Sequence, residues 1–133
     1  MDPTAGFGFA AGLVAMGAVV HYMRNQVASG AIGRNSAVGI RTRATMASDG
    51  AWRAGHAAAA PMLTVAFLTA YAAAATSLAL AAASASTGSG SPAAVIVPAA
   101  GTVAFLALLV TAAIKANSAA RAADGQDPPF GPH

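Results

Sequence analysis

The sequence of 133 residues contains no cysteine and no glutamate, and only 8 % of its residues are charged. Without cysteine the chain has no disulfide, no thiolate metal site and no thiol nucleophile. Soluble globular domains carry about 25 % charged residues, so the low charge excludes an ordinary soluble enzyme and a disordered chain. Hydrophobic residues make up 56 % of the chain, and the mean hydropathy is +0.60. This composition predicts a small integral membrane protein.

The few charged side chains lie at the N-terminus, between residues 24 and 53, and from residue 115 onward, which leaves three long uncharged segments. Each segment supplies the roughly 20 apolar residues that a helix needs to cross a membrane. We therefore predict an all-α membrane protein with three transmembrane helices, a basic loop and a short interfacial helix. The expected boundaries are a first span at 1–23, the loop and interfacial helix at 24–56, a second span at 57–83, a Ser/Gly hairpin at 84–92, a third span at 93–115 and a disordered tail at 116–133.

Arginines set the expected orientation of the chain in the membrane. The stretch 24–53 holds five arginines against one aspartate, whereas the hairpin 84–92 carries no charge. Because positively charged loops stay in the cytoplasm, we expect the loop and the C-terminus inside and the N-terminus outside. The chain begins Met-Asp-Pro-Thr instead of with a basic region, so we expect the first segment to be an uncleaved span.

Small residues are expected to pack the spans, because helices in lipid associate through close approach of their backbones. Gly8 and Gly12 lie four residues apart in the first span and form a candidate packing face. Two alternatives stay open: the face packs inside a three-helix bundle, or it docks a second copy or a larger membrane protein. Pro61 lies early in the second span, and its missing N–H predicts a kink near residues 57–60.

The basic loop carries the candidate binding residues. Glycines punctuate its first half, which predicts turns and extended backbone, and in an extended strand Arg41 and Arg43 project to one face. Two neighbouring guanidiniums can bind a phosphate or a carboxylate. The alternative is that these arginines only anchor the topology by contacting anionic lipid headgroups.

The second half of the loop predicts the start of a helix. Ser48 or Asp49 can cap it, and Asp49 and Arg53 are spaced as an i, i+4 ion pair. Trp52 is expected to anchor this helix at the interface, with its ring among the lipid headgroups.

His56 lies four residues after Trp52, at the expected edge of the membrane. We expect an interfacial or capping histidine; a proton sensor and a metal ligand together with His21 and Asp49 are the alternatives. Four aspartates and no glutamate offer no acid–base pair, so we expect no enzymatic activity, no metal and no cofactor. Trp52 is the one aromatic residue interleaved with the basic residues of the loop, which argues against binding of nucleic acid.

The loop contains a spaced pattern of residues, namely Asn35, Gly39-Ile40-Arg41-Thr42, Thr45, Trp52 and His56, followed by Pro61. With this pattern the loop resembles the SdpI family, small bacterial multi-span membrane proteins related to an immunity protein against a secreted killing factor. Relatives often carry an acidic residue two positions before the tryptophan, where this chain has Gly50. The resemblance implies a multi-pass protein of the bacterial inner cell membrane. Together with the pair of arginines, this pattern leads us to expect that a partner or a lipid headgroup is bound by Asn35, Gly39, Arg41, Thr42, Arg43, Thr45, Trp52 and His56.

Two functions are expected from these observations. The first is an immunity or signalling protein that senses an envelope ligand and engages a cytoplasmic partner through the loop. The second is a small accessory subunit of a larger membrane complex, such as an envelope-lipid transporter. The expected partners are membrane lipids, a larger membrane protein or a soluble regulator, and a second copy of the chain. The alanine-rich composition favours an actinobacterial source.

Overall fold

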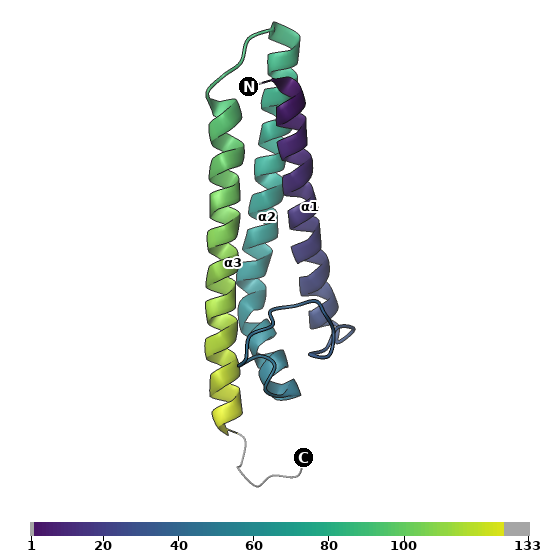
Figure 1. Cartoon of the computed structure of the whole chain (residues 1–133), viewed down its shortest axis with the longest axis vertical. Helices are drawn as coiled ribbons and strands as arrows, with labels where there is room; N and C mark the ends of the chain where they lie inside the picture. The colour runs from purple at the N-terminus through teal and green to yellow at the C-terminus, as the bar shows by residue number, and fades with distance from the viewer. Residues whose placement is uncertain (1, 127–133) are drawn as a thin grey trace. The chain divides into compact units, whose positions relative to one another are not determined.

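The computed structural model describes residues 2–126, and within that range it consists of three helices and two connections (Figure 1). Helix α1 spans Pro3–Ala28, α2 spans Asp49–Thr87 and α3 spans Ala93–Gln126. All three are long and apolar enough to cross a membrane, and the described range contains no strand. The predicted all-α class with three membrane-spanning helices is confirmed.

The outer surfaces of the helices are apolar. Side chains that are at least half exposed include Phe9, Val19, Leu68, Ile96, Val103, Leu106 and Ile114. An apolar surface of this kind suits contact with lipid and not with water. Threonine hydroxyls are satisfied within the helices, each donating to the carbonyl four residues earlier at 2.8–2.9 Å, as at Thr64, Thr69, Thr76 and Thr102. Such internal pairing is needed where water is absent.

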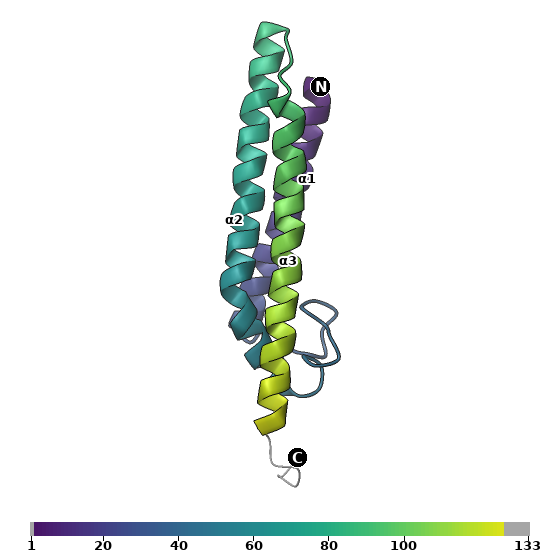
Figure 2. The same ribbon diagram turned by 90° about the vertical axis from the view of Figure 1, so that its left-hand side faces the viewer.

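The described residues divide into two compact units, one formed by 2–21 and 65–108 and the other by 22–64 and 109–126. Each unit contains a stretch of every helix. In the first unit α2 and α3 lie side by side and run in opposite directions (Figures 1 and 2). Helix α2 ends at Thr87, and the next residue, Gly88, caps it through a positive φ of 73° and an N–H that donates to the carbonyl of Ser84 (2.9 Å). The connection is therefore shorter than the predicted hairpin.

Close helix contacts in the first unit occur at glycines that the sequence did not single out. A Cβ on Gly17 would lie 2.8 Å from the ring of Tyr71, and a Cβ on Gly101 would collide with the Cβ of Ala73. These glycines let the backbones of α1 and α3 approach α2, which is how small residues pack helices in a membrane.

Gly8 and Gly12 do not have this role. No atom lies within 4 Å of the position that a Cβ would take on either residue. The alternative in which they pack spans inside the chain is therefore wrong, and docking of another molecule stays a prediction. They line a groove of about 490 Å³ together with Ala5, Phe9, Leu13, Met16 and Thr102.

Pro61 lies inside α2, which is one continuous helix through this residue. The side chain of Pro61 is exposed. The predicted interfacial helix is therefore the first two turns of α2 and not a separate element.

Helix α3 is longer than predicted. Residues 116–126 are helical, so the prediction of a disordered tail is wrong for this stretch. Alanine has the highest helix propensity, and the side chains of Ala116 and Ala120 are fully buried one turn apart. The remainder of the predicted tail, 127–133, lies outside the described residues.

Candidate functional site: the loop on helix α2

Helix α2 begins with a serine cap. The Oγ of Ser48 accepts a hydrogen bond from the N–H of Ala51 at 3.0 Å, so Ser48 is the N-cap of the two candidates. Asp49 forms an ion pair with Arg34 (2.9 Å), fifteen residues earlier. The predicted pair between Asp49 and Arg53 is wrong, because the folded loop brings Arg34 to the carboxylate.

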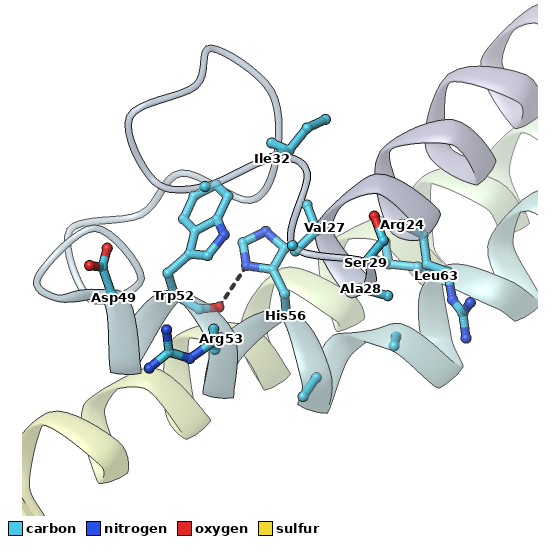
Figure 3. A pocket seen from close by; sticks show the side chains of 14 residues that line it. Arg24, Val27, Ala28, Ser29, Ile32, Asp49, Trp52, Arg53, His56 and Leu63 are labelled. Carbon is cyan, nitrogen blue, oxygen red and sulfur yellow. Dashed lines mark hydrogen bonds between the residues drawn. The ribbon is translucent and has the colours of Figure 1, made fainter.

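Both ring nitrogens of His56 are hydrogen-bonded, Nδ1 within α2 and Nε2 to the loop. Its Nδ1 lies 2.9 Å from the carbonyl oxygen of Trp52, a group that can only accept, so Nδ1 carries the hydrogen (Figure 3). Its Nε2 then accepts a hydrogen bond from the N–H of Ile40, also at 2.9 Å. The side chain is only 5 % exposed. A neutral imidazole with one defined tautomer is therefore part of the loop's structure.

Trp52 and Gly39 fit against each other. The indole is 3 % exposed, and its ring lies 4.1 Å from that of His56 between centroids. Gly39 has a φ of +122°, and a Cβ on it would lie 2.5 Å from Cη2 of Trp52 and 3.1 Å from Nε2 of His56. Only glycine satisfies both the backbone conformation and the space. Because the indole is covered by protein, the predicted anchoring of this ring among lipid headgroups is wrong.

Thr45 is fully buried and forms a hydrogen bond with the other backbone polar group of Ile40, its carbonyl. Its hydroxyl donates to the carbonyl of Ile40 (2.7 Å) and accepts from the N–H of Thr42 (3.0 Å). In return, the hydroxyl of Thr42 accepts from the N–H of Thr45 at 3.1 Å. Both backbone polar groups of Ile40 are thus paired with side chains of the motif. We call Gly39, Thr42, Thr45, Trp52 and His56 the loop scaffold.

The other three predicted site residues face outward. Asn35, Arg41 and Arg43 are exposed. The guanidinium of Arg41 donates to the carbonyls of Arg34 (3.2 Å) and Ser36, which stabilises the loop. The predicted extended strand is wrong, because residues 42–46 form a turn closed by a backbone hydrogen bond of 3.0 Å. Alternation in a strand therefore does not place Arg41 and Arg43 on one face.

Two contributors to the site were missed from the sequence. A Cβ on Gly55 would lie 2.9 Å from the carbonyl oxygen of Ala116 and 3.0 Å from Cγ2 of Thr45, so Gly55 allows α3 and the loop to approach α2. Its only sequence signal is a glycine inside a predicted helix. Ile40 acts through its backbone, for which the sequence offers no signal.

His21 belongs to the first unit. Its ring stacks on Phe67 at 4.1 Å between centroids, and its Nδ1 lies 3.2 Å from the hydroxyl of Tyr71. Within residues 2–126 no group of three or more histidine or aspartate residues is placed to hold a metal ion. The alternative of a metal site formed with Asp49 and His56 therefore has no support in the described structure.

The family comparison covers this loop. The model of the SdpI/YfhL protein family matches residues 31–115, which is more than half of the chain and includes the whole motif from Asn35 to His56. Neither the comparison with curated proteins nor the comparison with solved structures finds a match. The family match agrees with the resemblance of the loop and with the three apolar helices. The chain is therefore a multi-pass membrane protein that belongs to the SdpI/YfhL protein family.

Proposed function

We propose that this protein acts in immunity or signalling at the cell envelope and that its loop is the surface that binds a partner. The observation that carries the proposal is the buried, paired loop scaffold. A loop that only fixes topology needs positive charge and no defined fold. This loop instead has a fully buried threonine and a glycine at positive φ, and it is bound by a buried histidine of α2. Those features are understandable if the exposed residues above them must be held in one arrangement.

The proposed binding surface consists of Asn35, Arg41 and Arg43, the exposed members of the predicted site. Arg43 forms no ion pair with any residue in the described part of the chain. Guanidinium groups bind carboxylates through parallel hydrogen bonds, so an acidic surface on a soluble regulator or membrane protein is the expected partner. The charge distribution supports a cytoplasmic location for this surface. The proposed role involves no catalysis.

Co-purification in mild detergent tests the proposal. The Arg43→Gln protein should recover little of the partner. The matched variant Arg121→Gln, which removes the same charge from an exposed position on α3, should recover it as the unchanged protein does. Deletion of the gene should increase sensitivity to a secreted killing factor, and the Arg121→Gln protein should restore resistance. Equal recovery of the partner with both variants would contradict a binding role for the loop surface.

The second candidate function is an accessory subunit, and the free glycine face of α1 favours it. Gly8 and Gly12 line an apolar groove and contact no neighbour where a Cβ would be. In a membrane such a face permits close approach of another helix. Gly12→Leu should then release a stoichiometric membrane partner, while Arg43→Gln should leave that partner bound. The opposite pattern would favour the loop as the binding surface.

A further inference from the structure

A cavity of about 590 Å³ lies between the end of α1 and the start of α2, beside the loop scaffold (Figure 3). Its volume is in the range of pockets that bind small molecules, about 300–1,000 Å³. All the residues that line it belong to the second unit. We propose that this cavity binds the headgroup and the first acyl methylenes of an anionic membrane phospholipid.

The polar groups at the cavity are mainly hydrogen-bond donors with a positive charge. Arg24 and Arg53 both line the cavity, and Figure 3 shows them at opposite edges of it. The carboxylate of Asp49 is at the rim, but it is already paired with Arg34. Nη1 of Arg24 donates to the neutral amide oxygen of Asn25 (3.1 Å), so both guanidiniums of the lining keep their positive charge for an anionic ligand.

Two buried donors at the cavity have no partner among the described residues, the Nε1–H of Trp52 and the Nε–H of Arg24. The indole nitrogen lies on the side of the ring that faces His56 and the lining residues of α1 (Figure 3). Buried donors in native proteins are nearly always paired. Two unpaired donors at one cavity indicate that an acceptor from another molecule belongs there, and phosphate oxygens are strong acceptors.

The rest of the lining is apolar and selects a lipid over a free anion. Methyl and methylene groups come from Val27, Ile32, Ala57, Ala60 and Leu63. Ala60 and Leu63 belong to α2, a helix long and apolar enough to span a membrane. A free phosphate would leave this apolar surface uncovered, whereas the glycerol backbone and acyl chain of a phospholipid cover it. The site differs from the exposed surface proposed for partner binding, so either proposal can fail without the other.

Fluorescence of Trp52, the only tryptophan of the chain, tests the site directly. The purified protein in a neutral detergent is titrated with short-chain phosphatidylglycerol, and a saturable change in emission is expected. Loss of a charge-assisted hydrogen bond should weaken the affinity about tenfold in Arg24→Gln and in Arg53→Gln. Arg121→Gln, which removes a charge away from the cavity, should bind as the unchanged protein does. Because Arg53 is exposed, its substitution keeps the fold even where that of Arg24 does not.

Three results would overturn the proposal. The first is an equal response to phosphatidylcholine, which would mean that the cavity does not select an anionic headgroup. The second is an equally tight, saturable response to inorganic phosphate, which would identify a free anion as the ligand. The third is unchanged affinity in Arg53→Gln with native helicity.

Discussion

Replacing Gly39 with alanine is expected to open the loop while leaving the helices intact. The substitution places a Cβ 2.5 Å from Cη2 of Trp52 and 2.9 Å from its Cζ2, so the buried ring or the loop must move. It also forces a non-glycine residue to φ +122°, a conformation that costs about 1–3 kcal/mol. Displacement of the loop removes the Ile40–His56 hydrogen bond, which contributes about 1 kcal/mol.

Together these costs lower the free energy of loop opening by about 2–4 kcal/mol. A loss of 2 kcal/mol corresponds to roughly 30-fold faster exchange of the amide hydrogens that open with the loop. Hydrogen exchange followed by mass spectrometry measures this on peptides that contain Ile40. Gly33→Ala is the matched control, because Gly33 lies in the same loop and a Cβ there meets no atom within 4 Å.

In Gly33→Ala the exchange of the loop should stay within a few-fold of the unchanged protein. Circular dichroism should report the same helix content for both variants, because Gly39 lies outside the three helices. Equal exchange in Gly39→Ala and Gly33→Ala would refute the inferred packing of Gly39 against Trp52.

Three further predictions concern the loop and the start of α2. Thr45→Val should cost about 1–3 kcal/mol of loop stability by leaving the carbonyl of Ile40 unpaired, whereas Thr45→Ser should keep it, as loop exchange can show. Acidification should open the loop, because a protonated His56 cannot accept a hydrogen bond from the N–H of Ile40. The loop is therefore stable while the ring is neutral and loses stability as the pH falls. His56→Gln should abolish this dependence of loop stability on pH. Asp49→Asn should cost less than about 1 kcal/mol and show no effect at high salt, because the pair with Arg34 is largely exposed to solvent.

The helical architecture could be predicted from the sequence because it depends on local properties. Charges confined to three regions leave segments long enough to cross a membrane, and Ser48 offers a cap just before a helix. The extension of α3 was not predicted, because the Pro/Gly-rich end at 124–133 is typical of disorder and the predicted tail was begun at residue 116. The alanines just before that end favour a helix.

The interior of the loop could not be predicted in this way, because its contacts join residues distant in the chain. Ile40 and His56 are sixteen residues apart, and Arg34 and Asp49 are fifteen apart. The i, i+4 rule that paired Asp49 with Arg53 considers one isolated helix and contains no information about a loop folded over it. Trp52 illustrates the same limit, since an interfacial location and burial under a loop have the same sequence signal.

The membership of the family bears on this scaffold, because the matched region contains every scaffold residue. The resemblance pointed to the same positions without indicating that five of the eight are internal. The structure therefore separates residues that shape the loop from those that can contact another molecule. This distinction directs mutagenesis toward Asn35 and Arg43 for binding and toward Gly39 and Thr45 for folding, whereas the exposed Arg41 also stabilises the loop.

We claim that the motif folds the loop onto α2, and the hydrogen bond between Ile40 and His56 offers the most direct test. Nuclear magnetic resonance of nitrogen-15-labelled protein in micelles at neutral pH can identify the imidazole tautomer and detect coupling across this bond. The structure predicts a hydrogen on Nδ1 of His56 and coupling between its Nε2 and the amide of Ile40. A hydrogen on Nε2 with rapid exchange of the Ile40 amide would contradict the claim.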